Sequence, residues 1–390
     1  MAEARRIVLL GAMAQLPVAG VAWQVLHYLE GLRRLGHEVA YVEDTGSWPY
    51  DPDAETVTDD ARPAARRLAV LLEPCVDSDG WAFVNAARPG EVAGMGAARL
   101  REVLRDAEIL INLSGATVLR EAHLDVPVRI YLETDPVTPQ LEIDEGRQST
   151  VDLLAAHTHH FTFGERIGTP GCTVPTGPFT YRPTRQPVIL DWWEAPPARP
   201  VAAVRFTTVA AYRQPAKDVV WRGARYGWSK SEELAKLDGV PGRVPARLEL
   251  ALALSDRPEI ERLQRKGWRV VPAAGLSRDP AAYREYICGS DAEFSVAKDQ
   301  NVRLRSGWFS DRTASYLAAG RPAVVQDTGF DAALPTGEGL LSFRTPDEAV
   351  AAVIEVAVDL PRHARAARRI AAEHFRAEEV LARLLVEAGA

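Results

Sequence analysis

The stretch "SGWFSDRTASYLAAGRPAVVQDTGF" (residues 306–330) decides the fold. Ser310 is a suitable N-cap for a short helix, and Gly320 followed by Pro322 is a typical helix end. The apolar run that follows (323–327) predicts a buried strand, which leads into a polar loop with a second glycine. A helix that runs into a buried strand is the repeating unit of a parallel sheet with helices on both faces.

The same alternation of apolar strands and helices occurs twice along the chain. The first half predicts strands at 6–12, 38–44, 107–115, 128–134 and 160–165, and the second half at 202–212, 247–255, 267–275, 292–298, 323–327 and 339–343. A proline-rich passage (175–200) can continue neither a helix nor a central strand, so it predicts the connection between two domains. We therefore predict an α/β protein with two tandem, doubly wound, Rossmann-like domains that face a cleft.

The predicted division of the chain follows from this plan. Residues 1–183 form the first domain, 184–372 form the second, and 373–390 form a C-terminal helix that returns to the first domain. In parallel sheets of this kind, ligands bind outside the carboxyl ends of the strands. With two such domains, the cleft between them is the expected ligand site.

Composition limits the classes of function. The chain has 390 residues, 47% of them hydrophobic, and a net charge of −7, which does not favour a general nucleic-acid binder. Its three cysteines are far apart, so we expect neither a disulfide framework nor a cysteine zinc site. The apolar run at 6–12 predicts a first strand rather than a signal peptide, and no apolar stretch has the length of a membrane span. We expect a cytoplasmic protein, and the sequence leaves open whether it forms a homodimer.

Loops at the carboxyl ends of the first-half strands supply candidate residues. Gly20 opens a helix N-terminus to a ligand, or forms an ordinary turn. Glu133 and Asp135 stand where a strand ends, where a carboxylate could accept a proton from an acceptor hydroxyl; Asp135 could also serve the turn before Pro136. His27 is the alternative base, although its helical position also suits packing. The sequence "HTHH" (157–160) lacks the partners of a familiar metal site, and we predict no bound metal.

The second half carries candidate residues for binding a phosphate-bearing ligand, the donor of a transferred group. Arg213 and Lys217 follow its first strand and suit a diphosphate; Trp228 could stack on a base or pack in the core, with Lys230 nearby. Cationic and polar groups at later strand and helix ends are Lys298, Ser310, Asp311, Arg312, Asp327, Thr328 and Gly329. Because a helix N-terminus has unpaired N–H groups, Ser310–Arg312 predicts an anion site; alternatively, Asp311 only complements the helix dipole.

These residues resemble a known family. The passage "YLAAGRPAVVQDTGF" (316–330) is similar to glycosyltransferases of the GT-B fold, of the group 1 or family 4 type, and the likeness extends over about 200–375. Arg213 and Lys217 resemble the diphosphate-binding pair of that family. The family's two glutamates, eight positions apart, correspond here to Gly307 and Ser315, so the resemblance implies that the donor sugar is held differently.

The expected function is transfer of a sugar from a nucleoside diphosphate sugar to a hydroxyl or amine of a small-molecule acceptor, without a metal or other cofactor. The alanine- and arginine-rich composition is compatible with natural-product biosynthesis. A sugar-nucleotide epimerase of the same fold and a non-catalytic nucleotide-binding protein remain alternatives; a nicotinamide or flavin enzyme is disfavoured because GxGxxG is absent. On this hypothesis, Arg312→Ala weakens diphosphate binding and leaves the fold intact.

Overall fold

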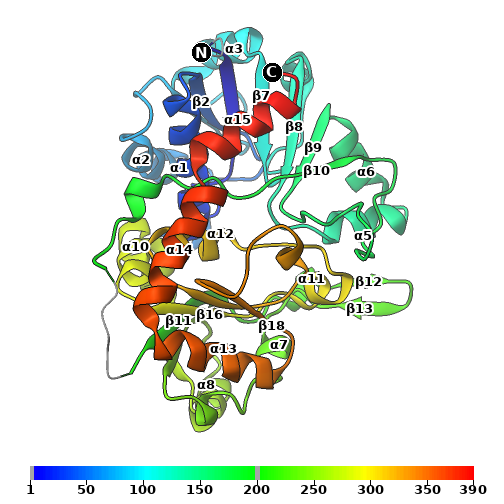
Figure 1. Cartoon of the computed structure of the whole chain (residues 1–390). Coiled ribbons are helices and arrows are strands. Elements are labelled where there is room, and N and C mark those ends of the chain that lie inside the picture. The colour runs from blue at the N-terminus through cyan, green and yellow to red at the C-terminus, as the bar shows by residue number, and fades with distance from the viewer. Residues whose placement is uncertain (1–3, 198–202) are drawn as a thin grey trace.

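Two α/β domains lie one above the other in the computed structural model, which describes residues 4–197 and 203–390 (Figure 1). Residues 198–200 of the proline-rich passage and residue 202 of a predicted strand lie outside the described residues. The predicted architecture of two Rossmann-like domains is confirmed by the two parallel sheets described next.

The first domain is built on an eight-stranded sheet in the order β10-β9-β8-β7-β1-β2-β5-β6, parallel except for the antiparallel edge strand β6. The central strand β7 is buried along its whole length and β8 over its last four residues, because helices cover both faces of the sheet. The strands are β1 (Arg6–Leu10), β2 (Glu38–Glu43), β5 (Trp81–Val84), β6 (Val92–Gly94), β7 (Ile109–Leu113), β8 (Val128–Glu133), β9 (His159–Thr162) and β10 (Tyr181–Pro183).

Six helices and one small hairpin complete the first domain. The predicted strand positions agree with β1, β2, β7, β8 and β9, whereas β5, β6 and β10 had no counterpart in the sequence prediction. The remaining elements are α1 (Ala19–Arg34), β3 (Tyr50–Asp51), β4 (Thr56–Val57), α2 (Arg62–Leu72), α3 (Gly96–Asp106), α4 (Glu121–Leu124), α5 (Thr138–Asp144) and α6 (Gln148–Ala155).

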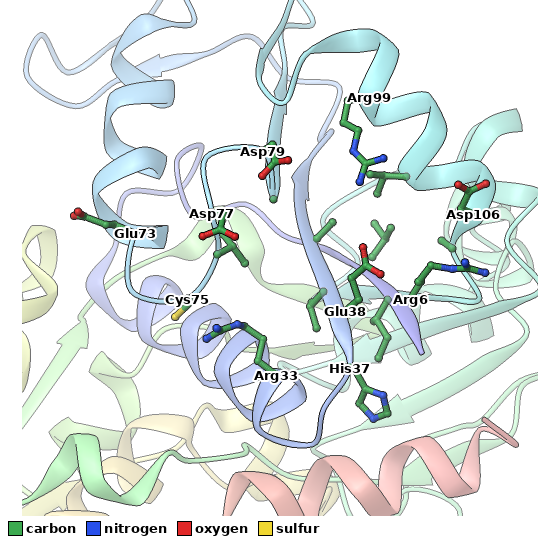
Figure 2. Close-up of a pocket in the computed structure, with 18 of the residues that line it drawn as sticks. Arg6, Arg33, His37, Glu38, Glu73, Cys75, Asp77, Asp79, Arg99 and Asp106 are labelled. Atoms are coloured by element: carbon green, nitrogen blue, oxygen red, sulfur yellow. The ribbon is translucent and has the colours of Figure 1, made fainter. Parts of the chain in front are cut away.

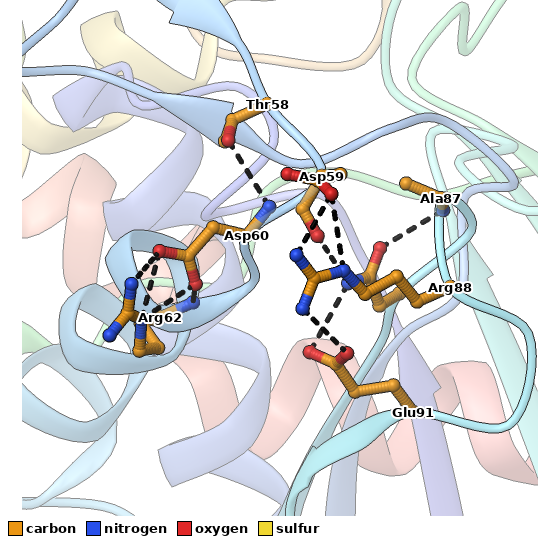
Figure 3. A network of polar contacts seen from close by, with 8 residues as sticks. Thr58, Asp59, Asp60, Arg62, Ala87, Arg88 and Glu91 are labelled. Atoms are coloured by element: carbon orange, nitrogen blue, oxygen red, sulfur yellow. Dashed lines mark hydrogen bonds and ion pairs between the residues drawn. The ribbon is translucent and has the colours of Figure 1, made fainter.

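A surface network fastens the β3–β4 hairpin to the turn between β5 and β6 (Figure 3). The carboxylate of Asp59 accepts a hydrogen bond from Arg88 Nη2 at 2.8 Å, and the Asp59 carbonyl accepts one from Asn85 Nδ2 at 2.9 Å. Next to them, Asp60 accepts from the backbone N–H and side chain of Arg62 at the start of α2. These contacts fasten the segment after the β3–β4 hairpin to the carboxyl end of β5, near the outer end of the sheet.

The second domain has a six-stranded parallel sheet in the order β15-β14-β11-β16-β17-β18. Each of its strands coincides with a predicted one. They are β11 (Arg205–Ala211), β14 (Arg247–Ala253), β15 (Arg269–Pro272), β16 (Ala292–Ser295), β17 (Ala323–Gln326) and β18 (Leu340–Phe343). An antiparallel hairpin of β12 (Val219–Trp221) and β13 (Ala224–Tyr226) extends from the loop after β11 and packs against α5 of the first domain.

Helices of the second domain begin where the sequence supplies caps. The side chains of Asp256, Asp279 and Thr345 each accept a backbone N–H at the start of a helix. The helices are α7 (Ser231–Ala235), α8 (Arg257–Arg265), α9 (Ala274–Arg278), α10 (Pro280–Cys288), α11 (Asp299–Leu304), α12 (Asp311–Ala318) and α13 (Pro346–Val358); one-turn 3-10 helices are η1 (Leu190–Trp193), η2 (Pro215–Lys217), η3 (Pro241–Arg243) and η4 (Phe330–Ala332).

The chain crosses between the domains twice, and the two crossings run side by side. Val188 N–H donates to the Phe375 carbonyl at 2.7 Å, and Ala377 N–H donates to the Val188 carbonyl at 3.0 Å. The helix α14 (Leu360–His374) packs on α12 of the second domain, and α15 (Ala377–Glu387) packs on α1 of the first (Figure 1). Leu381 of α15 is fully buried in the first domain's core.

No helix within residues 4–197 and 203–390 combines the length and apolar character needed to cross a bilayer.

Candidate active site

The carboxyl edges of the two sheets meet in an ion pair between domains. Asp135 follows β8 of the first domain, and Lys298 follows β16 of the second and starts α11. The Lys298 ammonium binds the Asp135 carboxylate, with side-chain exposures of 10% and 38%. Neighbouring contacts close the same seam: Trp308 Nε1 donates to the Thr134 carbonyl at 3.0 Å. The structure therefore brings together two residues that the sequence placed on separate strand ends.

The ring of Trp228 packs beside Lys298 and a second lysine, Lys217. The Lys298 Nζ lies 3.2 Å from the centroid of the Trp228 ring, and the Lys217 Nζ lies 5.1 Å from it. The ring is held in place because Trp228 Nε1 donates to Gln214 Oε1 at 2.9 Å. Close by, the Lys230 Nζ lies 5.9 Å from the centroid of Trp308. Four predicted donor-binding residues thus form one cluster, which we call the lysine cluster: Lys217, Trp228, Lys230 and Lys298.

The electrostatics of the lysine cluster favour binding of an anion. Burial, then the charges of Arg312 and Lys298, lower the pKa of Lys230 to about 7. Burial lowers the pKa of Lys298 to about 8, although Asp135 opposes this effect. Burial and mutual repulsion both disfavour the charged form of these lysines. A nearby anion stabilises the charged form, because it offsets the repulsion and the lost hydration. A diphosphate has the required charge.

Arg312 lies beneath this cluster rather than in it. Its Nε donates to Glu293 Oε1 at 2.8 Å, its Nη1 to the Val209 carbonyl at 2.8 Å, and its Nη2 to Ser295 Oγ at 2.6 Å. Arg312 is only 8% exposed and Glu293 is fully buried. This arrangement corrects the prediction that Arg312 binds a diphosphate directly, and it leads us to expect that Arg312→Ala disturbs the fold.

The N-terminus of α12 has a cap residue without a capping bond. Ser310 occupies the N-cap position, as predicted, yet its side chain accepts no backbone N–H of the helix. Asp311 begins the helix, and burial raises the pKa of its carboxyl. Both residues lie at the cleft-facing edge of the second sheet, and their role in donor binding stays a prediction.

The loop after β17 is not available to a ligand as the sequence suggested. The Asp327 carboxylate is paired with Arg305 at 3.0 Å and Arg344 at 2.5 Å; although burial opposes ionisation, the Gly329 N–H and these two guanidinium groups lower its pKa. Thr328 Oγ donates to the Trp308 carbonyl at 2.6 Å. These bonds correct the prediction that Asp327, Thr328 and Gly329 bind the donor.

Arg166 of the first domain explains why glycine stands where the resembling family has its first glutamate. Gly307 has φ +77°, and a Cβ there would lie 2.8 Å from Arg166 Cγ and from its backbone nitrogen. Gly329 has φ +96°, and a Cβ there would lie 2.9 Å from Arg166 Cδ. The Arg166 N–H also donates to the Ser306 carbonyl at 3.0 Å. In this closed arrangement the Arg166 segment fills the space in which an acidic side chain at 307 would have to lie.

Two other candidate bases are buried away from the cleft. Glu133 is 2% exposed, and its oxygens accept from Gln140 Nε2 at 2.8 and 2.9 Å and from Thr162 Oγ at 2.7 Å; burial raises its pKa to about 7. His27 is 1% exposed, with its ring nitrogens facing the Ile189 N–H and the Trp193 Nε1–H, and burial lowers its pKa to about 3. Both placements correct the prediction of a catalytic base at these residues, because neither side chain reaches a ligand.

The remaining predicted residues lie at the rims. Gly20 is in the first turn of α1, and a Cβ there would meet open space. Arg213 is exposed and pairs with Asp256 at 3.2 Å and Glu259 at 3.5 Å rather than joining the lysine cluster.

Sequence reasoning missed a polar group beside Asp135. Ser114, in the loop after β7, has φ +58°, and its Oγ lies 2.6 Å from Thr134 Oγ and 3.5 Å from Gln24 Oε1. The only available signal was a serine–glycine pair directly after a buried strand. The left-handed backbone at Ser114 costs free energy in a non-glycine residue, which is common at functional sites.

Two small cavities lie within the second domain, near the end of its sheet that faces the first domain. One, of about 20 Å³, lies between Trp308, Arg312 and Phe330, and a second of about 20 Å³ lies beside Lys230. A larger cavity of about 430 Å³ opens at the amino ends of β1 and β2, on the opposite edge of the first sheet; Arg6, Arg33, Glu38, Asp77 and Asp79 project around it (Figure 2). Its position and mixed charges set it apart from the Asp135 site.

Comparison with known proteins identifies the fold. No protein-family model and no curated protein sequence matches the chain. Solved structures do match: AviGT4, a glycosyltransferase involved in avilamycin A biosynthesis, has 15% identity and a TM-score of 0.55, covering 98% of this chain and 97% of that chain. HepE from Anabaena, in complex with UDP and glucose, has 11% identity and a TM-score of 0.55 (98% and 99%).

An alpha-glucosyltransferase in complex with UDP and a 13-mer DNA has 11% identity and a TM-score of 0.57, with 100% of both chains covered. Because these matches extend over nearly the whole of each chain, they confirm that both domains together form the GT-B fold.

Proposed function

We propose that the protein is a glycosyltransferase that moves a sugar from a nucleoside diphosphate sugar to a hydroxyl or amine of a small-molecule acceptor. The observation that supports this most directly is the lysine cluster, which faces Asp135 at the seam of a GT-B fold. Similar folds occur in glycosyltransferases solved with UDP, and in one involved in avilamycin A biosynthesis, which favours a sugar-nucleotide donor and is compatible with natural-product chemistry.

The lysine cluster has the chemistry needed at the leaving group. When the bond between the anomeric carbon and the diphosphate breaks, negative charge grows on the diphosphate oxygens. Lys298, Lys230 and Lys217 are cations held at the position where that charge would develop, and preorganised cations stabilise such a transition state without reorganising. We propose that these ammonium groups do the work of a metal, so that the reaction needs no cofactor.

Asp135 is the base that we propose for the acceptor. Its Oδ1 is buried without a hydrogen-bond partner, while its Oδ2 binds Lys298. When a diphosphate draws Lys298 towards itself, the Asp135 carboxylate is released to accept a proton from the acceptor as the new bond to the anomeric carbon forms. Because Lys298 and Trp308 of the second domain directly contact Asp135 and Thr134 of the first, we propose that the domains separate to admit the donor and close again around it.

The proposal is tested by titrating UDP, GDP and TDP and their glucose esters into the protein by calorimetry. Lys298→Met is expected to weaken the preferred nucleotide at least about tenfold, because it loses one charge-assisted contact. Lys266→Met, which changes an exposed lysine at the end of α8, is the matched control and should leave the affinity for the nucleotide unchanged. Equal affinities in all three proteins would contradict the proposed donor site.

Release of nucleoside diphosphate only when an acceptor is present separates transfer from the alternatives. An epimerase would convert the sugar nucleotide without releasing diphosphate, and a binding protein would not turn it over.

A further inference from the structure

The ligand-facing edge of the first sheet changes character from one end to the other. Adjacent strands there run in the order β8, β7, β1, β2, and the loop after each leaves the sheet on the side that meets the second domain. Neighbouring strands are about 4.8 Å apart, so this row of loops is about 14 Å long. Asp135 stands at its β8 end.

The β8 end of this row, with the start of the loop after β7, is polar. Ser114 is exposed, and its hydroxyl lies 2.6 Å from that of Thr134, the residue before Asp135. A hydroxyl that is within reach of solvent, held by its neighbours and next to a proposed base, is suited to bind the hydroxyl of another molecule.

Exposed apolar side chains occur later in the same β7 loop and on the loops after β1 and β2. Val118 in the loop after β7 is 66% exposed, Leu16 in the loop after β1 is 54% exposed, and Trp48 in the loop after β2 is 55% exposed. Gln15 Nε2 donates to the Trp48 carbonyl at 2.7 Å, which ties the second loop to the third. Large exposed apolar side chains on adjacent loops favour a binding surface, whereas isolated ones are ordinary.

We infer that the acceptor is a molecule with an apolar body and one hydroxyl end: the hydroxyl lies against Ser114 and Asp135, and the body lies across Val118, Leu16 and Trp48. The inference rests on the proposed glycosyltransferase function and adds the class of acceptor. A length of about 14 Å fits a compound of two or three fused or linked rings. Such a body gains affinity by removing apolar surface from water, which a hydrophilic sugar acceptor cannot do.

The test uses two probe acceptors with the preferred donor: 4-methylumbelliferone, which is apolar with one hydroxyl, and methyl glucoside, which is polar. Wild-type protein should have at least about tenfold higher kcat/KM for 4-methylumbelliferone. Val118→Ser and Trp48→Ser should each raise its KM about fivefold and leave methyl glucoside unaffected. Val386→Ser, which changes a 74% exposed valine of α15, is the matched control.

Ser114→Gly removes the hydroxyl and suits the left-handed backbone, so the loop should keep its shape. It should lower kcat/KM for both acceptors, because both present a hydroxyl, while the calorimetric affinity for nucleotide stays within twofold. A preference for methyl glucoside, or unchanged KM in Val118→Ser and Trp48→Ser, overturns the inference.

Binding of 4-methylumbelliferone is also followed by its fluorescence anisotropy, so that the result does not depend on turnover. If the nucleotide binds but 4-methylumbelliferone neither binds nor reacts, the acceptor inference fails and the donor site stands. If no nucleoside diphosphate binds, both the proposed function and the acceptor inference fail.

Discussion

Arg312→Ala is expected to destabilise the second domain rather than only to weaken ligand binding. The substitution removes the only ion-pair partner that Glu293 has within residues 4–197 and 203–390, and the Glu293 carboxylate is fully buried in β16. The Glu293 Oε2 already lacks a hydrogen bond, so the ion pair is the main compensation for burying this charge. Without Arg312, the protein must either keep an uncompensated buried carboxylate or protonate it.

The magnitude follows from the burial of both partners. Breaking a buried ion pair by removing one side costs about 3–5 kcal/mol, which includes the bonds that Arg312 makes to Val209 and Ser295. For a domain of about 180 residues, each kcal/mol lowers Tm by about 2–4 °C, so Tm should fall by roughly 6–20 °C. The exposed pair of Arg213 and Asp256, with side-chain exposures of 49% and 44%, gives a contrasting case.

Thermal unfolding followed by fluorescence, with urea titration for the free energy, measures the effect. Arg213→Ala is the control and should shift stability by less than about 1 kcal/mol. The double variant Arg312→Met with Glu293→Gln should regain at least half of the loss, because it removes both charges together. If Arg312→Ala instead unfolds within 2 °C of wild type and loses nucleotide affinity, Arg312 is a ligand contact and this reasoning is refuted.

Three further outcomes are expected. Asp135→Asn should lower kcat by about 10²–10⁴-fold with nucleotide affinity changed less than threefold, measured by steady-state kinetics and calorimetry; equal turnover would remove Asp135 as the base. Nucleotide affinity should fall as pH rises from 6 to 9, since Lys230 and Lys298 lose their protons near pH 7 and 8, and Lys230→Met should flatten the lower part of that profile. Burial raises the pKa of Glu133 to about 7, so the folded state holds a proton that the unfolded state releases near pH 4.5. The free energy of unfolding should therefore fall as pH rises from 4.5 to 7, and Glu133→Gln should reduce that fall by roughly 1–3 kcal/mol. The same pH dependence of urea unfolding in Glu133→Gln and wild type would count against this prediction.

Local sequence signals predicted the secondary structure well where they were strong. The helix that begins after Ser310 and ends before Gly320 is α12, and Gly320 has φ +66° as a helix-ending glycine should. Short elements escaped prediction: β5 and the β12–β13 hairpin have only three or four residues each. Their pairing partners, rather than any pattern of their own, hold them in place, so a local window contains little information about them.

The site was predicted only in part, for a similar reason. Lys298 and Lys217 were identified because they follow buried strands, and strand ends of a parallel sheet share one edge. Trp228 was identified as a ring that could stack on a base, with Lys230 nearby. Whether a charged side chain at such an end points out or in depends on what lies beside it. Arg312 pairs with the buried Glu293, and the buried Asp327 pairs with Arg305; no spacing in the sequence discloses either pair.

The sequence by itself therefore determined the two parallel sheets, their connection and the loops that carry polar residues, because strands and helices are encoded by short-range patterns of apolar residues and caps. The tertiary structure decided which of those polar residues face a ligand. It paired Arg312 with Glu293 inside the second domain, closed Arg166 over Gly307, and set Lys298 of one domain against Asp135 of the other. These contacts join residues far apart in the chain, so their energies depend on burial and distance in the folded protein.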